Sequence, residues 1–248
     1  MTIIATYNIK GGVGKTSTAV NLAYLAAQNN YKTLVWDLDP QGASSFYFRV
    51  KPKVKGGSKD LIAGARELDG LIKATDFENL DLLPADFSFR NLDLVLDERK
   101  KPTQRLKKLL APLTKEYDII ILDCPPNISL LSEAIFEASQ LIVSPIIPTI
   151  LSLRTLEQLK KYIKDNNLKH IKLLPFFSMA DRRKKMHREI IESLVEKHPD
   201  ILNTVIPYAS DIERMGLERM PLGGYMKKSR SVDAYQSLWK EILDLLGK

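Results

Sequence analysis

Short runs of apolar residues recur along the chain, and stretches of more mixed polarity separate them. Several runs, such as residues 119–122, are apolar throughout instead of alternating with polar residues. Strands of that kind are typical of parallel sheets that are covered by helices on both faces. The pattern predicts strands at residues 2–7, 33–37, 80–83, 118–122, 141–144, 171–177 and 203–206.

Longer stretches with helical periodicity lie between these strands and predict helices at residues 15–28, 102–115, 152–166, 183–197 and 231–246. This alternation indicates an α/β fold with a doubly wound, mostly parallel twisted sheet. Because no linker rich in glycine, serine or proline divides the chain, we expect residues 1–248 to form a single domain. Segment 49–59 has five basic residues, no acidic residue and a Gly-Gly pair, and we predict an exposed loop there.

The composition narrows the class of protein. Of the 248 residues, 44% are hydrophobic and 27% are charged, which excludes a disordered chain and a small disulfide-stabilised scaffold. No apolar run is long enough to span a membrane, and the first residues lack the pattern of a secretory leader. The single cysteine, Cys124, indicates a reducing compartment, so we expect a cytoplasmic protein. The net charge of +7 permits a polyanionic partner.

A glycine-rich segment follows the first predicted strand and leads into the first predicted helix. It departs from the strict phosphate-loop pattern because Ile9 stands where that pattern has glycine. Its three glycines still allow backbone N–H groups to converge on an anion at a helix N-terminus. Lys15 then reaches the β- and γ-phosphates of a nucleotide, and the Thr16 hydroxyl is a ligand for Mg²⁺. The residues predicted to bind the nucleotide here are Lys10, Gly11, Gly12, Val13, Gly14, Lys15, Thr16 and Ser17.

A second lysine, Lys10, precedes the first glycine of this segment. With it, the segment resembles the loop K-G-G-x-G-K-[ST] of the deviant Walker group of P-loop ATPases. The resemblance implies ATP and Mg²⁺ as cofactors and catalytic roles for Lys10 and Lys15. In that group the first lysine contacts phosphates bound by the other subunit of a homodimer. Lys10 is therefore expected to link ATP binding to dimerisation.

Two further segments place carboxylates where predicted parallel strands end. Asp37 and Asp39 lie on one side of the backbone after the second strand, and Asp123 ends the strand at 118–122. Ligands of open α/β sheets bind at this end of the strands, and Asp123 is suited to contact Mg²⁺ through water. The sequences D-x-D-P-Q-G and D-x-P-P are similar to switches I and II of the ParA family. This similarity implies that Asp39 orients the attacking water, and we expect Asp37 to help hold the magnesium shell.

The resemblance to the ParA family extends over nearly the whole chain. Met179 and Pro207 fall where the family builds its adenine pocket. Segment 208–211 reads Tyr-Ala-Ser-Asp, whereas many ParA proteins have a DNA-contacting arginine there. Because the phosphate loop begins at Lys10, we expect the short type of ParA protein, without an N-terminal helix-turn-helix domain.

Two basic clusters lie in the C-terminal part of the chain. Residues 182–188 carry five cations and no acidic residue, and they open a predicted helix, where cations oppose the helix dipole. Each cluster taken singly is compatible with a solvated surface. In a ParA-like chain we interpret the two together as a surface for nonspecific double-stranded DNA. The residues are Arg182, Arg183, Lys184, Lys185, Arg188, Lys227, Lys228 and Arg230.

These features together predict a ParA-type ATPase that dimerises with ATP, binds the nucleoid and positions a plasmid, chromosome region or protein organelle such as a carboxysome. The resemblance implies a ParB-like or cargo-adaptor protein that stimulates hydrolysis. The alternative is a MinD-like ATPase at a membrane. We expect no membrane partner, because the last predicted helix has acidic residues on its polar face and an apolar side suited to the core. That side comprises Val232, Tyr235, Leu238, Trp239, Ile242 and Leu245.

Overall fold

The parallel sheet expected from the sequence is present in the computed structural model, which describes residues 1–64, 68–198 and 200–247. Within these ranges the sheet has eight strands in the order β3-β4-β2-β5-β1-β6-β7-β8. Every neighbouring pair is parallel except β3 with β4. The strands are β1 (Thr2–Thr6), β2 (Thr33–Asp37), β3 (Lys73–Ala74), β4 (Leu80–Leu83), β5 (Ile119–Asp123), β6 (Leu141–Ile146), β7 (Lys172–Ala180) and β8 (Val205–Pro207).

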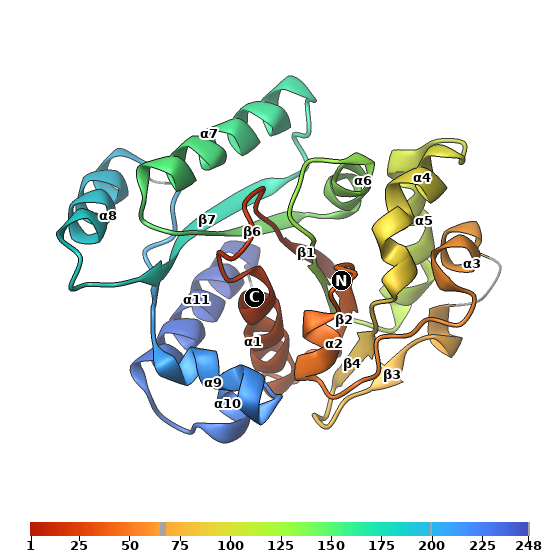
Figure 1. Cartoon of the computed structure of the whole chain (residues 1–248), viewed down its shortest axis with the longest axis horizontal. Coiled ribbons are helices and arrows are strands. Elements are labelled where there is room, and N and C mark those ends of the chain that lie inside the picture. Colours follow the sequence, from red (N-terminus) through yellow and green to blue (C-terminus); the bar gives the residue numbers. More distant parts are fainter. Residues whose placement is uncertain (65–67, 199, 248) are drawn as a thin grey trace.

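Helices cover both faces of this sheet (Figure 1). Those of the described ranges are α1 (Lys15–Gln28), α2 (Ala43–Tyr47), α3 (Gly57–Ala63), α4 (Leu92–Asp97), α5 (Arg105–Leu110), α6 (Leu130–Ala138), α7 (Ile150–Asp165), α8 (Lys185–Lys197), α9 (Ser210–Glu218), α10 (Leu222–Tyr225) and α11 (Arg230–Leu246). The fold is therefore a doubly wound α/β fold. The chain winds from β1 towards β2 and β4 on one side and from β6 towards β8 on the other, so the direction reverses at β1.

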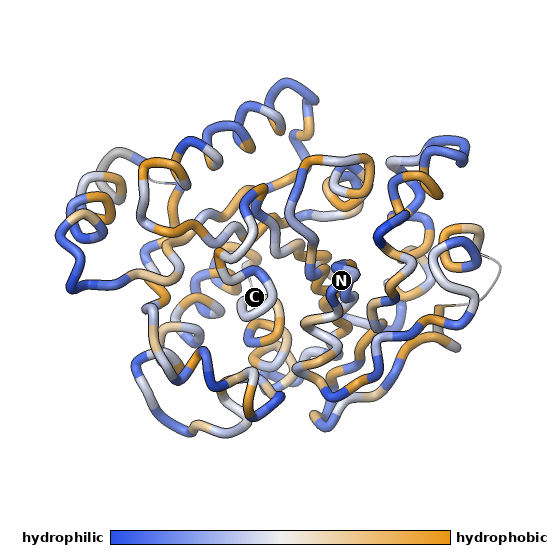
Figure 2. Tube along the Cα trace, viewed as in Figure 1, coloured by the Kyte–Doolittle hydropathy of each residue, from blue (hydrophilic) through white to orange (hydrophobic). Residues whose placement is uncertain are grey.

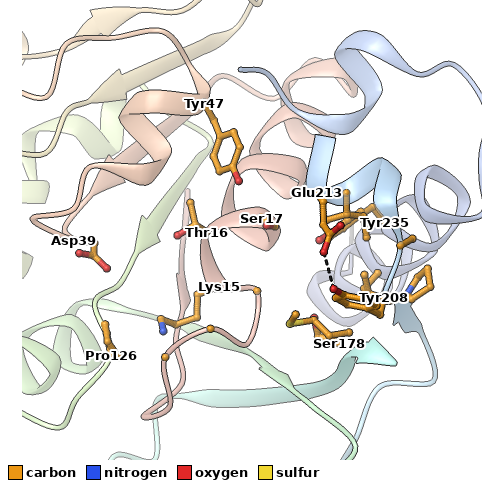
Figure 3. A pocket seen from close by; sticks show the side chains of 18 residues that line it. Lys15, Thr16, Ser17, Asp39, Tyr47, Pro126, Ser178, Tyr208, Glu213 and Tyr235 are labelled. Carbon is orange, nitrogen blue, oxygen red and sulfur yellow. Dashed lines mark hydrogen bonds between the residues drawn. The ribbon is translucent and has the colours of Figure 1, made fainter. Parts of the chain in front are cut away.

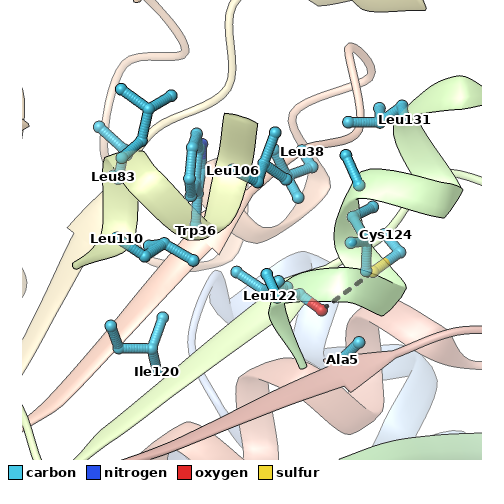
Figure 4. Packing of buried hydrophobic residues seen from close by; sticks show 14 of the residues in the cluster. Ala5, Trp36, Leu38, Leu83, Leu106, Leu110, Ile120, Leu122, Cys124 and Leu131 are labelled. Atoms are coloured by element: carbon cyan, nitrogen blue, oxygen red, sulfur yellow. Dashed lines mark hydrogen bonds between the residues drawn. The ribbon is translucent and has the colours of Figure 1, made fainter. Parts of the chain in front are cut away.

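Adjacent strand residues supply two separate cores. Val35 and Ile121 pack with α1 and α11 on one face, whereas Trp36 and Ile120 pack with α5 and α6 on the other. Successive side chains of a strand point to opposite faces, so a strand buried between two helical layers is apolar at every position. Figure 4 shows the second core, where Trp36 lies close to Leu110 of α5.

The predicted helix at 102–115 is divided into shorter pieces. Pro102–Gln104 and Pro112–Lys115 form single 3₁₀ turns, and only α5 between them is α-helical. Proline lacks the N–H donor that an α-helix needs in its interior, which explains the interruption at Pro112. The loop predicted at 49–59 is a loop only as far as Gly56: α3 begins at Gly57, and the Val54 side chain is buried. The sequence did not predict α2, α3, α4, α6, α9, α10 or the antiparallel edge strand β3.

The last helix packs into the core, as expected. Figure 2 shows hydrophobic residues along the central strands and hydrophilic residues on the outer turns of α7 and α8. The expectation was wrong for Leu245, which is 40% exposed. Among the described residues, no helix combines the length and the apolar character needed to cross a bilayer. The buried residues of α11 include Val232, Tyr235, Leu238, Trp239 and Ile242.

Candidate functional site

The glycine-rich loop connects β1 to α1 at the carboxyl edge of the sheet. Gly12 and Gly14 have φ values of 70° and 95°, in the left-handed region that residues with a Cβ rarely adopt. A Cβ on Gly14 would also lie 3.0 Å from the Ser178 hydroxyl oxygen on β7. Glycine is therefore required for the backbone angle at both positions, and at Gly14 for the close approach of β7 as well.

The two lysines of the loop have different surroundings. Lys15 is buried, and its Nζ donates a hydrogen bond to the Lys10 carbonyl oxygen at 3.2 Å. Burial lowers the pKa of Lys15, and the nearby acidic groups, chiefly Asp123, oppose that effect. The backbone N–H of Lys10 donates to Asn8 Oδ1 at 2.8 Å, while the Lys10 side chain is partly exposed. Lys15 lines the cavity described below, and Lys10 does not.

Asp123 is fully buried at the end of β5, where it meets the start of α1. Its Oδ1 accepts a hydrogen bond from the Thr16 hydroxyl at 3.3 Å, and its Oδ2 accepts one from the Ser44 hydroxyl at 2.7 Å. Burial raises the pKa of Asp123 to about 6, although both hydroxyl groups favour the ionised form. The structure thus brings together Thr16 and Asp123, two of the three residues expected at Mg²⁺.

These two residues fit magnesium. A hydroxyl and a carboxylate are hard oxygen ligands, and Mg²⁺ in nucleotide sites is usually held by one or two such groups together with phosphate oxygens. The described part of the chain contains no cluster of three or more His, Cys, Asp and Glu side chains that would make a closed metal site. Thr16 and Asp123 would therefore hold Mg²⁺ only in combination with a bound phosphate.

Asp37 lies behind Asp123 and outside the cavity. The two residues pair across β2 and β5, and both are fully buried. Asp37 Oδ2 accepts hydrogen bonds from the backbone N–H and the hydroxyl of Ser45, both at 2.8 Å. Within the described residues its Oδ1 has no partner. Burial and the neighbouring Asp123 raise the pKa of Asp37 to about 8. The geometry assigns Asp37 to fastening α2, and its place in the magnesium shell stays a prediction.

One cavity of about 420 Å³ contains most of the predicted nucleotide-binding residues. Asp39 lies at one end, where its Oδ1 accepts a hydrogen bond from the Gln41 backbone N–H at 2.9 Å. Figure 3 shows Lys15 and Thr16 between Asp39 on one side and Tyr208 and Glu213 on the other. The cavity wall includes Gly11, Gly12, Gly14, Lys15, Thr16, Ser17, Asp39, Met179 and Pro207 from the predicted set, and Val13 is fully buried behind it.

The end of the cavity away from Asp39 has residues that sequence reasoning missed. The Tyr208 hydroxyl donates a hydrogen bond to Glu213 Oε1 at 2.7 Å, and this bond raises the pKa of Tyr208. Tyr235 was assigned to the core from its place on the apolar side of the last helix, and it belongs to both the core and the cavity wall. The sequence pointed to this region through Met179 and Pro207. The residues of the whole cavity wall that the sequence did not assign to the site are Tyr47, Pro126, Ser178, Tyr208, Ala209, Ile212, Glu213 and Tyr235.

The two basic clusters differ in how far their charges are compensated. Arg182, Arg183 and Lys184 precede α8 instead of lying within it. Asp181 accepts two hydrogen bonds from the Arg183 guanidinium, at 2.9 and 3.0 Å, and Lys185 lies 3.5 Å from Glu189. Arg188 donates to a backbone carbonyl oxygen at 2.6 Å. In the second cluster Lys227, Lys228 and Arg230 are exposed, and no carboxylate of the described residues lies within ion-pair distance of them.

Comparison with known proteins adds to this geometry. A family model described as an AAA domain matches residues 1–174. The sporulation initiation inhibitor protein Soj of Bacillus subtilis is 32% identical over 97% of both chains. The chromosome partitioning protein ParA of Myxococcus xanthus is 28% identical and matches 97% of this chain and 87% of its own length.

A similar solved structure is cobyrinic acid a,c-diamide synthase from Mycobacterium smegmatis with a bound ATP analog and magnesium. It has a TM-score of 0.81 and 25% identity, and the match covers 98% of this chain and 94% of that one. The family assignment rests on the phosphate loop and on the carboxylates at the ends of β2 and β5. It rests also on the full-length similarity to Soj. The chain belongs to the ParA family of P-loop ATPases.

Proposed function

We propose that this ATPase forms a sandwich dimer with ATP and Mg²⁺, binds double-stranded DNA nonspecifically, and thereby positions a cargo over the nucleoid in the cytoplasm. The cargo is a plasmid, a chromosome region or a protein organelle, and a ParB-like or adaptor protein stimulates hydrolysis and ends the cycle. One observation carries the proposal: Lys15, Thr16, Asp39 and Asp123 converge at the reversal of the sheet, while Lys10 on the same loop stays outside the cavity.

The residues at this site are suited to phosphoryl transfer. The loop N–H groups and Lys15 would hold the phosphates, and Thr16 and Asp123 would hold Mg²⁺, which would supply positive charge to the phosphoryl group. Asp39 is partly exposed, and its Oδ2 has no hydrogen-bond partner among the described residues, so it is available to orient a water molecule. At the far end, Met179 and Pro207 provide an apolar surface for the base. The magnesium and ATP analog in the mycobacterial structure support this choice of cofactors.

Exposed apolar side chains around the loop support dimerisation through the same edge of the sheet. Ile128 follows β5 and is 42% exposed, while Ile150 and Leu151 follow β6 and are 69% and 57% exposed. β5 and β6 flank β1, so these side chains lie on either side of the phosphate loop. Clustered exposed apolar residues are typical of protein–protein contacts. A second subunit on this face would cover them and receive Lys10 at its phosphates.

A dimer would also strengthen DNA binding. A DNA duplex binds through its phosphates, and joining two subunits doubles the number of cations that meet it. If the dimer neutralises about five phosphates, a fourfold increase in salt lowers the affinity roughly 500-fold. DNA binding would then depend on nucleotide through dimerisation. The MinD-like alternative lacks support in α11, because the apolar side of that helix is mostly buried against the sheet.

The substitution Lys10→Ala tests the dimer. Multi-angle light scattering with ATP and Mg²⁺ is run in an Asp39→Ala background, which slows hydrolysis. The parent should have twice the chain mass of 28.1 kDa, and Lys10→Ala should remain at the mass of one chain. Lys161→Ala, which removes an exposed lysine of α7, is the matched control and should dimerise. A dimer of normal stability in the Lys10 variant would contradict the role in the second subunit.

Charge reversal tests the DNA-binding surface. A mobility shift with ATP, ADP or no nucleotide compares two variants, one with Lys227, Lys228 and Arg230 changed to Glu and one with Arg182, Arg183 and Lys184 changed to Glu. Because Arg183 is already paired with Asp181, the first variant should lose more affinity per charge reversed. Both should still dimerise. Unchanged DNA binding in both variants would contradict the assignment of these clusters to DNA.

A further inference from the structure

A second hollow lies beside the segment that follows α2, and the charged residues of its described lining are all lysines. Its volume is about 550 Å³. The segment after α2 contributes Val50, Lys51, Lys53 and Lys55, and the residues entering β3 contribute Gly70, Leu71 and Lys73. We name this feature the basic hollow. None of its residues belongs to the nucleotide cavity or to the clusters assigned above to DNA.

Among the described residues, no ion pair holds the four ammonium groups of the basic hollow, and Lys53 interacts electrostatically with a carboxylate, that of Asp86. Two described acidic residues near the hollow make their hydrogen bonds and ion pairs with other groups. Asp76 pairs with Arg49 at 3.5 Å, and Asp86 accepts hydrogen bonds from the Val54 backbone N–H and from Ser88. Four like charges therefore meet in one hollow, and within the described ranges none of them is held in an ion pair.

Protection of a sheet edge explains only one of these lysines. β3 is the outermost strand, and Lys73 on it is exposed, as expected for a charge that prevents pairing with another sheet. Lys51, Lys53 and Lys55 come from a different segment that forms no strand. Bringing like charges together from two segments is unfavourable for the isolated chain, so an anionic ligand is the physical reason we infer for their convergence.

The lining indicates which anion fits. Single-stranded nucleic acids bind where aromatic side chains stack on the bases, and phosphates are held best by the paired donors of arginine. The described lining has neither: apart from lysine it consists of Val50, Gly70 and Leu71. A DNA duplex is convex and does not enter a hollow of this size. Ammonium groups around an aliphatic floor match a peptide with carboxylate and apolar side chains.

We propose that the basic hollow docks an acidic segment of a partner protein. Its carboxylates contact Lys51, Lys53, Lys55 and Lys73, and an apolar side chain rests on Val50 and Leu71. The location connects this site to hydrolysis. A Cβ built on Gly42 would lie 3.0 Å from Pro52, between the first two lysines, and the Gly42 N–H donates to the Asp39 carbonyl oxygen at 2.9 Å. A segment bound in the hollow therefore presses on the turn that carries Asp39.

The test uses the full chain and a fluorescein-labelled peptide of six glutamates with two central leucines, followed by fluorescence anisotropy. One variant changes Lys51, Lys53 and Lys73 to Glu. The matched control changes Lys161, Lys164 and Lys169 to Glu, which alters the net charge equally at exposed positions in and after α7. The hollow variant should bind at least tenfold more weakly than the parent, and the control less than threefold more weakly. Thermal melting of each variant verifies folding.

Three results would overturn the proposal. Equal losses in the hollow and control variants would mean that the peptide responds only to net charge. Unchanged affinity in the hollow variant would place the peptide elsewhere. Displacement of the peptide by a 20-base-pair DNA duplex, with a matching loss of DNA affinity in the hollow variant, would make the site one for nucleic acid. The peptide-binding measurement needs no nucleotide. Its outcome therefore does not depend on whether the proposed ATP-driven cycle is correct.

Discussion

Replacement of Asp37 by asparagine tests the electrostatics beneath the site. Asp37 is fully buried, and burial together with Asp123 raises its pKa from an ordinary 3.8 to about 8. Near neutral pH the native chain therefore keeps a proton on Asp37 that the unfolded chain has released. Since the native state binds more protons, the free energy of unfolding falls as the pH rises towards 8. The amide introduced by Asp37→Asn cannot ionise, so this loss should be absent from the variant.

Between pH 6 and pH 8 the difference in pH-dependent stability between the parent and the variant comes mainly from Asp37. Below pH 6 the titration of Asp123, whose pKa is about 6, also lowers the free energy of unfolding as the pH rises. Across these two pH units the parent should lose roughly 2 kcal/mol relative to the asparagine variant, because the slope of about 1.4 kcal/mol per unit falls by half as the pH reaches the pKa of Asp37. For a chain of this size that corresponds to a difference in melting temperature of about 4–8 °C. Histidines titrate alike in both proteins, so their effects cancel in the comparison.

The assay is thermal unfolding followed by circular dichroism in metal-free buffer at pH 6 and pH 8. Asp165→Asn, which removes an exposed carboxylate at the end of α7, is the control and should follow the parent. The reasoning is refuted if Asp37→Asn loses as much stability between pH 6 and pH 8 as the parent does. That result would mean that Asp37 is ionised in the native protein despite its burial.

Two other predictions concern the cavity itself. Asp39→Ala should bind ATP with near-parental affinity yet hydrolyse it 10²- to 10⁴-fold more slowly, the range for loss of a group that handles the attacking water; a phosphate-release assay showing parental turnover would remove Asp39 from that role. Magnesium binding requires ionised Asp123, whose pKa is raised to about 6, so the Mg²⁺-dependent part of the ATP affinity should fall about tenfold per pH unit below pH 6. Calorimetric titrations at pH 5 and pH 7 would contradict this if the affinities were equal.

The sequence predicted best the elements that are determined by residues close together in the chain. Strand 33–37 and helix 15–28 agree with the structure residue for residue, because a fully buried strand and a helix after a glycine-rich loop have strong signals of their own. α2 was missed because a five-residue helix leaves no periodicity to detect. Ser44 was missed for another reason: its hydroxyl bonds a carboxylate 79 residues away, and only the assembled sheet brings the two together.

Tyr235 shows the same limit for the cavity wall. Its spacing in the last helix predicted a buried position, and the residue is indeed 3% exposed. Helical periodicity distinguishes an inner from an outer face, but it does not say whether the inner face meets the sheet, a ligand or both. Tyr235 contacts the core and also borders the nucleotide cavity, because α11 crosses near the carboxyl edge of the sheet.

The short helix α2 has no stability of its own, since isolated helices of fewer than about 12 residues scarcely form in water. Three hydrogen bonds to the rest of the fold stabilise it. Ser44 donates to Asp123 and Ser45 donates to Asp37. The Phe46 carbonyl oxygen accepts a bond from Nε of Arg219, the residue after α9, at 3.3 Å. The position of α2 therefore depends on all three of these hydrogen bonds. An ion that took the place of Ser44 at the carboxylate would remove one of these bonds, and α2 would then be held by Asp37 and by Arg219, which follows the helix that carries Glu213.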